Sequence, residues 1–304
     1  MTSPSPGAAP TSAFRCSVAA ERRGDSQVGT APPARRWLLI EHRGPWAFAA
    51  VASSGIDPLV LAELQQAADR AAARILLIRR PGRREATGAR SWAVVSHEGA
   101  AVWGTWSADD QLRTAVEALG MPPASGQADP VLLVCAHGLH DPCCAVRGRP
   151  VAAALQQQWP EWTWECSHVG GDRFAPNVVV LPDGAYYGGV GVLDAVTTIR
   201  AHLEGAVQAQ HLRGLSTMSP PAQAAVVAAH ARYGPAGARQ ISVAEVHRVG
   251  DHRFAVAIRG SGTVPAQLHA VVRARRLPDA LLTCRASAET SSLDYVVETL
   301  EPLL

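Results

Sequence analysis

Short runs of consecutive apolar residues alternate with longer amphipathic segments along most of the chain. The runs RWLLIEH (36–42), ARILLIRR (73–80) and VLLV (131–134) lack polar alternation, which is typical of strands buried on both faces of a parallel sheet. Between the first two runs, Asp57-Pro58 has the pattern of a helix N-cap followed by proline at the first helical position. This order of elements predicts the α/β fold class.

Residues 15–127 are predicted to form an N-terminal α/β part. The segment SWAVVSHEGAAVWGTWS (91–107) indicates two strands joined by a turn, and 108–119 indicates a helix, so the order is β-α-β-β-β-α. The short polar segment MPPASGQADP (121–130) is typical of a linker. Residues 1–14, rich in Pro, Ser, Ala and Thr, are predicted to be a disordered tail.

Residues 128–212 are predicted to form a thioredoxin-like domain. A strand that ends at Cys135, a helix that begins at Cys143 and a strand that ends at Cys166 come first. A hairpin with an Asp-Gly turn (178–190) and another helix follow. The resulting order, β-α-β-β-α, is that of a thioredoxin-like fold.

Residues 213–304 are predicted to form a small accessory α+β module. Ser219 followed by two prolines predicts the start of a helix that continues to Tyr233. From Ile241 onward the pattern indicates strands near 241–249, 254–260, 265–273, 280–285 and 293–299.

Composition narrows the function classes. All 28 basic residues are arginine and the net charge is +2; because the arginines are dispersed and only 5% of residues are aromatic, nucleic-acid binding is not expected. No apolar run approaches the ~20 residues that a membrane span needs, and the N-terminus lacks the features of a secretory signal. We therefore expect a cytoplasmic protein, in which six cysteines suit metal binding or redox chemistry better than a disulfide scaffold.

Two pairs of side chains are candidates for that chemistry. Cys135 ends a predicted strand and Cys144 lies in the first turn of a predicted helix, where free N–H groups favour a thiolate. Thiolates select iron–sulfur clusters, zinc or copper(I). His168 and Asp172 flank Gly170-Gly171, a turn that lets backbone approach a bulky ligand. Imidazole is a known cluster ligand, whereas a carboxylate is a rarer one.

The same residues carry a resemblance. The segments CAHGLHDPCCAVRGRPVAAAL, CSHVGGDRFAPNVVVLPDGAYYG, GTAPPARRWLLIEHRGPW and LLIRRPGR resemble the sucrase/ferredoxin-like family, whose members are relatives of the thioredoxin-like [2Fe-2S] ferredoxins. The resemblance covers about residues 15–210. It implies that 128–212 is a thioredoxin-like ferredoxin domain that binds a [2Fe-2S] cluster through Cys135, Cys144, His168 and Asp172. No pair of carboxylates with a glycosidase pattern supports sucrase activity.

The fourth ligand stays open at this point. Related ferredoxins carry Cys-x3-Cys or His-x-Gly-Gly-His in the second half of the motif, so Asp172 stands where those proteins have cysteine or histidine. Cys166, on the preceding strand, is an alternative fourth ligand, and His137 and His140 are further candidates. A branch of the family without a cluster is also compatible with this departure. The remaining cysteines, Cys16, Cys143 and Cys284, are expected to be buried structural thiols.

The sequence thus favours an iron–sulfur electron carrier over a catalyst. Its partner would be a redox protein, either a reductase or an electron acceptor, with no nucleic acid and no membrane involved. One alternative is a cluster-free thiol-disulfide oxidoreductase that uses Cys135, Cys143 or Cys144, although the Cys-x-x-Cys spacing is missing. The other is a zinc-binding structural module with the same ligands. The electron donor, the electron acceptor and the oligomeric state cannot be predicted from the sequence.

Overall fold

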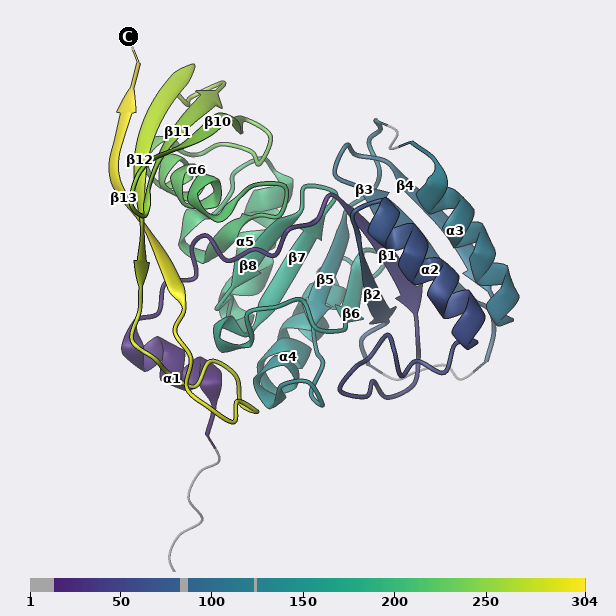
Figure 1. Cartoon of the computed structure of the whole chain (residues 1–304). Coiled ribbons are helices and arrows are strands. Elements are labelled where there is room, and N and C mark those ends of the chain that lie inside the picture. The colour runs from purple at the N-terminus through teal and green to yellow at the C-terminus, as the bar shows by residue number, and fades with distance from the viewer. Residues whose placement is uncertain (1–13, 83–86, 123–124, 304) are drawn as a thin grey trace, which may run out of the picture.

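The computed structural model of the chain describes residues 14–82, 87–122 and 125–303 (Figure 1). The predicted disordered tail, 1–14, lies outside this range except for Phe14. Nine strands form one mixed sheet, in the spatial order β4-β3-β1-β2-β6-β5-β7-β8-β9. Their bounds are β1 (Arg36–Glu41), β2 (Ala73–Arg79), β3 (Arg90–Ser96), β4 (Ala101–Trp106), β5 (Val131–Cys135), β6 (Thr163–Cys166), β7 (Asn177–Leu181), β8 (Ala185–Gly188) and β9 (Leu212–Leu215).

The described helices pack mainly on the outer face of this sheet or at its ends. Figure 1 shows α2 and α3 beside each other over the strands of the N-terminal part, and the side chains of Leu38 and Leu77 pack against them. Leu132 and Val178 pack in the same way against α4 and α5. The bounds are α1 (Cys16–Arg23), α2 (Pro58–Arg70), α3 (Arg113–Gly120), α4 (Pro142–Gln158), α5 (Val192–Leu203) and α6 (Pro220–Tyr233).

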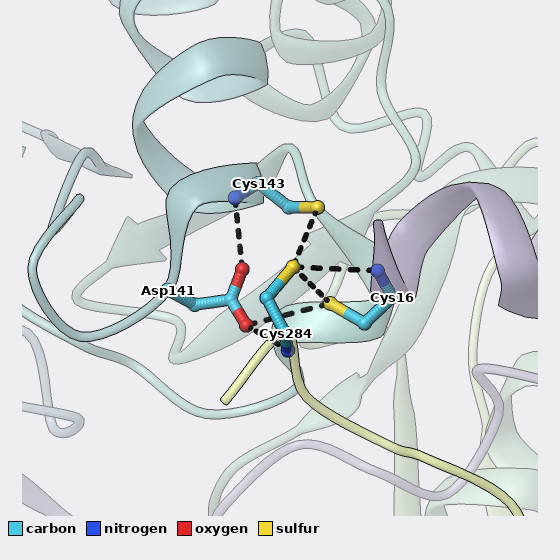
Figure 2. Close-up of side chains that lie close together, drawn as sticks. All are labelled: Cys16, Asp141, Cys143 and Cys284. Carbon is cyan, nitrogen blue, oxygen red and sulfur yellow. Dashed lines mark hydrogen bonds between the residues drawn. The ribbon is translucent and has the colours of Figure 1, made fainter. Parts of the chain in front are cut away.

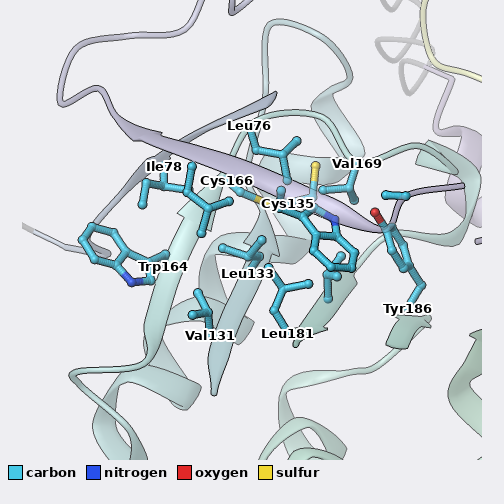
Figure 3. Packing of buried hydrophobic residues seen from close by; sticks show 14 of the residues in the cluster. Leu76, Ile78, Val131, Leu133, Cys135, Trp164, Cys166, Val169, Leu181 and Tyr186 are labelled. Carbon is cyan, nitrogen blue, oxygen red and sulfur yellow. The ribbon is translucent and has the colours of Figure 1, made fainter. Parts of the chain in front are cut away.

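The other face of the sheet carries one buried cluster to which both parts of the sheet contribute. Strands β2 and β6 pair antiparallel over only two residue pairs, Ile78↔Cys166 and Arg79↔Glu165, and the two parts of the sheet meet there. Figure 3 shows Leu76 and Ile78 of β2 opposite Leu133 of β5 in a single buried cluster. The parts expected on either side of residue 128 therefore share one sheet and one core.

A second, antiparallel sheet completes the fold. It has the order β10-β11-β12-β13, and its bounds are β10 (Ile241–Gly250), β11 (Arg253–Gly260), β12 (Gln267–Arg276) and β13 (Leu293–Pro302). Its apolar face packs on α6, which in turn contacts β9. The predicted α/β fold class with a smaller C-terminal α+β module is confirmed.

Two details differ from the sequence pattern. Strand β9 was not predicted, and it spans residue 212, the expected end of the central domain. The strand expected near 280–285 is wrong, because only an isolated bridge, Ala280↔Thr290, occurs there. The main-chain N–H of Cys284 is instead bonded to a distant carboxylate, described below. Within the described ranges, no helix is both long and apolar enough to cross a membrane.

Candidate metal centre

Cys135 and Cys144 are brought together by the way α4 packs on the end of β5. Asp141 caps α4 through its side-chain oxygen, which accepts the N–H of Cys143 at 2.8 Å, and Pro142 follows at the first helical position. Further along the helix, Gly148 lies so close to β5 that a Cβ atom would be 2.1 Å from the carbonyl oxygen of Cys135. This close approach places the thiol of Cys144 beside the strand end, and both cysteines are buried.

His168 and Asp172 lie on the turn that follows β6. Gly170 and Gly171 have φ angles of 88° and 77°, in the left-handed region that favours glycine. The buried guanidinium of Arg213 on β9 stabilises the turn, because it donates a hydrogen bond to the carbonyl of Gly170 at 2.8 Å. The backbone of the turn is therefore fixed from outside the motif.

The four residues expected as cluster ligands lie in contact. The thiol of Cys144 donates a hydrogen bond to Oδ1 of Asp172 at 3.2 Å, and Nδ1 of His168 lies 2.9 Å from the same oxygen. The neighbouring Cys144 and His168 hold the pKa of Cys135 well below its usual range, despite burial. The proximity of Cys135, together with burial, raises the pKa of Cys144 well above its usual range.

An ion pair forms the other half of the site. Burial alone lowers the pKa of His168, but the Asp172 carboxylate and the Cys135 thiolate outweigh it and raise that pKa to about 9. Burial raises the pKa of Asp172, and the neighbouring His168 outweighs that effect and lowers it. Although Nδ1 of His168 is close to Asp172, it has no partner with hydrogen-bond geometry among the described residues. A metal could bind this buried ring nitrogen only after the imidazole loses its proton.

The two other histidines of the motif have different roles. His137 is buried; its Nε2 lies 2.7 Å from the carbonyl oxygen of Ala47, and its Nδ1 accepts the main-chain N–H of His168 at 3.3 Å. Both ring nitrogens of His137 are therefore engaged. His140 stacks on His168 with ring centroids 3.7 Å apart, and its Nε2 lies 3.8 Å from Oδ2 of Asp172. His140, His168 and Asp172 form a group whose ligand atoms lie within 4.8 Å of one another.

Cys166 lies next to Cys135, and both side chains face the buried core. The two residues are paired across the parallel strands β5 and β6, and both thiols belong to the buried cluster in Figure 3. Burial raises the pKa of Cys166 well above its usual range. Among the described residues, Cys135, Cys144 and Cys166 all lie outside the two groups whose ligand atoms are within 4.8 Å of one another.

The second such group consists of Cys16, Asp141, Cys143 and Cys284. From the sequence, its three cysteines were expected to be buried structural thiols, with Cys143 also a candidate for thiol-disulfide exchange. Cys143 and Cys284 are separated by 141 positions, and Cys16 and Cys284 by 268. No motif has such spacings, so no local signal in the sequence could have joined them.

The fold and the site define a mixed α/β protein with a group of three cysteines and an aspartate that could bind a metal ion. The chain belongs to the sucrase/ferredoxin-like family, whose model matches residues 27–214, more than half of the chain. Among solved structures, it is similar to a cysteine-to-serine variant of the thioredoxin-like [2Fe-2S] ferredoxin from Aquifex aeolicus. The identity is 23%, the match covers 28% of this chain and 97% of that chain, and the TM-score is 0.24. No curated protein matches the chain.

Proposed function

We propose that this protein is an iron–sulfur electron-transfer or redox protein that binds a [2Fe-2S] cluster through Cys135, Cys144, His168 and Asp172. One observation carries the proposal: two thiols, an imidazole and a carboxylate from two separate segments meet at one end of the sheet. The family to which the chain belongs supports an iron–sulfur function.

The donor set fits such a group. Two sulfur atoms and one imidazole nitrogen are established ligands of [2Fe-2S] clusters, and the Nδ1 atom of His168 is buried without a hydrogen-bond partner among the described residues. Cys135 is fully buried and Cys144 is 1% exposed, so water is excluded from the sulfur side. A bound cluster would supply one-electron redox chemistry.

We assign the fourth position to Asp172 rather than to Cys166. The carboxylate of Asp172 contacts both Cys144 and His168, whereas no hydrogen bond or ion pair joins the thiol of Cys166 to either residue among the described side chains. His137 would act as a positioning residue, because its ring accepts the main-chain N–H of His168 and thereby orients that ligand. Loading the site would require His168 to lose the proton that its raised pKa retains.

A redox partner protein would approach the histidine side of the site. The side chains of His140 and His168 are partly exposed, at 23% and 27%. Phe48 stacks on His140 with ring centroids 4.8 Å apart and is itself 58% exposed; Leu139 beside it is 54% exposed. These rings lead from the surface to a proposed ligand. Exposed apolar side chains of this kind suit a transient contact with another protein.

Metal analysis and spectroscopy test the proposal. Anaerobically purified and reconstituted protein should contain two irons and two sulfides per chain and give the electron paramagnetic resonance signal of a reduced [2Fe-2S] cluster. Cys144→Ser should lose the iron, while the matched variant Cys166→Ser should retain it. Protein that stays colourless and iron-free after reconstitution contradicts the proposal. Unchanged spectra in Asp172→Ala remove Asp172 from the ligand set.

One observation favours a second function, cluster-free thiol-disulfide exchange. The lowered pKa of Cys135 next to the thiol of Cys144 is the arrangement that exchange requires. Both sulfurs are buried, however, so a disulfide substrate could not reach them without local opening. Disulfide reductase activity of the iron-free protein that is lost in Cys144→Ser would support this function.

A further inference from the structure

A second set of soft ligands lies at the start of α4 (Figure 2). Cys16 is the first residue of α1, Cys143 lies in the first turn of α4, and Cys284 comes from the segment between β12 and β13. The Sγ atom of Cys284 lies 3.3 Å from that of Cys143 and 3.5 Å from that of Cys16. The carboxylate of Asp141 completes the group, with Oδ2 3.5 Å from Sγ of Cys16.

We propose that Cys16, Cys143, Cys284 and Asp141 bind a zinc ion in a closed structural site. Zinc favours four tetrahedral ligands, and with Zn–S bonds of about 2.3 Å its sulfur ligands lie about 3.8 Å apart. The four ligand atoms here already lie within 4.8 Å of one another, so small side-chain movements suffice. Thiolates select zinc or iron over harder metals such as magnesium.

Burial and charge support a cation at this point. Asp141 and Cys16 are fully buried, and Cys143 is 2% exposed. Across the described part of the chain, no arginine or histidine forms an ion pair with Asp141, so its negative charge has no cationic partner. Burial of a carboxylate is costly when only hydrogen bonds compensate its charge, and a bound metal ion would offset that charge directly.

The carboxylate is held in place for this role. Its Oδ1 accepts the N–H of Cys143 at 2.8 Å, and its Oδ2 accepts the N–H of Cys284 at 2.7 Å. Oδ2 also accepts the thiol of Cys16 at 3.5 Å, and loss of that thiol proton on metal binding would free this position for the metal. Metal ligands are commonly fixed by such hydrogen bonds to their remaining positions.

The path of the chain around Cys284 gives an independent reason for a metal. Residues 277–292 form no strand or helix, and their two arms are joined only by the isolated bridge Ala280↔Thr290 and by a hydrogen bond from the N–H of Leu277 to the carbonyl of Ser292. A turn at 283–286 places Cys284 next to α1 and α4, and Figure 1 shows this segment beside α1. Long connections without regular structure are uncommon in compact domains and usually have a function. A metal ion bound by Cys284 would fix the connection formed by residues 277–292.

The site is separate from the one assigned to the cluster. Cys16 and Cys284 lie outside residues 27–214, the part matched by the family. The zinc ion would connect α1 and the C-terminal module to the start of α4. It differs from the zinc module considered from the sequence, which used Cys135 and Cys144. The inference does not rest on the [2Fe-2S] proposal, because the two sites use different residues.

Metal content of the full-length protein tests this inference. After expression with iron and zinc, and dialysis against a chelator under reducing conditions, the wild type should retain one zinc per chain. Cys284→Ser and Cys16→Ser should lose the zinc and keep the iron. The matched control Cys144→Ser, at the neighbouring position in α4, should lose the iron and keep the zinc. Asp141→Asn keeps the cap to Cys143 and should weaken zinc binding on the order of 10–100-fold.

Zinc X-ray absorption of the wild type gives a test that needs no variant. The expected shell is three sulfurs at about 2.3 Å and one oxygen at about 2.0 Å. A shell of nitrogen and oxygen alone means adventitious zinc and overturns the inference. Zinc retained in both Cys284→Ser and Cys16→Ser, or a zinc-free wild type after reconstitution, also overturns it. So does a Cys143–Cys284 disulfide found by mass spectrometry in protein kept under reducing conditions. Iron content and zinc content are measured independently. A failure of the [2Fe-2S] proposal can therefore be distinguished from a failure of the zinc proposal.

Discussion

The thiols of Cys143 and Cys144 face two different groups of ligands, although the two residues are consecutive in the first turn of α4. Sγ of Cys144 lies 3.2 Å from Oδ1 of Asp172, and Sγ of Cys143 lies 3.3 Å from Sγ of Cys284. Successive residues in an α-helix project about 100° apart, so one helical turn can serve both groups. Both groups therefore depend on how α4 packs against the sheet.

Gly148→Ala should disturb that packing. The new Cβ atom would lie 2.1 Å from the carbonyl oxygen of Cys135, which is backbone and cannot move aside easily. The helix would have to shift away from β5, and we expect a loss of about 1–3 kcal/mol in the free energy of unfolding, measured by urea denaturation. The same shift should reduce the iron retained after reconstitution, because it separates Cys144 from Cys135.

Gly120→Ala is the control for this prediction. Gly120 is the exposed last residue of α3, and a Cβ atom there would meet nothing within 4 Å. The free energy of unfolding of Gly120→Ala should differ from that of the wild type by no more than about 0.5 kcal/mol. Equal effects of the two alanine substitutions would show that the contact between Gly148 and Cys135 does not limit the packing of α4.

Asp172→His should raise the reduction potential of the proposed cluster. The substitution replaces a negatively charged ligand by a neutral imidazole, which favours the reduced, more negative state. We expect a rise on the order of 100 mV, measured by redox titration of the electron paramagnetic resonance signal. Asp172→Asn removes the charge without adding an imidazole, so its reduction potential should lie between those of the wild type and Asp172→His. A potential that is the same in all three proteins would contradict ligation by Asp172.

Arg213→Met should destabilise the turn that carries His168 and Asp172. Arg213 is 1% exposed and donates hydrogen bonds to the carbonyls of Gly170 and Thr30 and to Oδ1 of Asn177. Methionine fills similar space but leaves these buried acceptors unpaired, at a cost of about 2–4 kcal/mol.

Hydrogen exchange by mass spectrometry checks this prediction. Peptides that cover the turn should exchange faster in Arg213→Met, and urea denaturation should give the loss of stability. Arg259→Met, at an exposed position of β11, should change neither measurement beyond about 0.5 kcal/mol in stability. Unchanged exchange in Arg213→Met would mean that the two glycines alone hold the turn.

The sequence pattern predicted most elements because each one carries its own local signal. The apolar runs at 36–42 and 73–80 became β1 and β2, and the Asp57-Pro58 pattern became the capped start of α2. Strand β9 escaped prediction because its four residues, LRGL, include an arginine and a glycine. Arg213 lies in that strand, and its partners all come from other parts of the chain.

The two candidate metal sites also differ in whether a local signal in the sequence indicates them. Cys135, Cys144, His168 and Asp172 lie on two short motifs whose spacing is visible in the sequence, and the resemblance rests on those motifs. The order of the nine strands depends on long-range pairing such as Ile78↔Cys166. The single buried cluster on one face of the sheet depends on the same pairing. The meeting of Cys16 with Cys284 follows from that long-range packing, so no pattern along the chain could indicate it.

Protonation of His230 should destabilise the protein at mildly acidic pH. His230 lies on α6, is 3% exposed, and neither ring nitrogen has a hydrogen-bond partner among the described residues. Burial, with a smaller contribution from His202, lowers the pKa of His230 to about 4. The folded protein therefore keeps this imidazole neutral where the unfolded chain, with an ordinary histidine pKa of about 6.5, binds a proton.

Stability contributed by the neutral form is complete above about pH 6.5 and is lost as the pH falls toward 4, because the unfolded state binds more protons in that window. The shift from 6.5 to about 4 corresponds to roughly 3 kcal/mol at the acidic end. His230→Leu should remove this loss, so that the difference in free energy of unfolding between variant and wild type grows in favour of the variant from pH 7 to pH 4. His247→Leu, at an exposed position of β10, is the matched control and should follow the wild type. Urea denaturation at a series of pH values measures the difference, and parallel curves for wild type and His230→Leu would show that His230 gains a proton equally in both states.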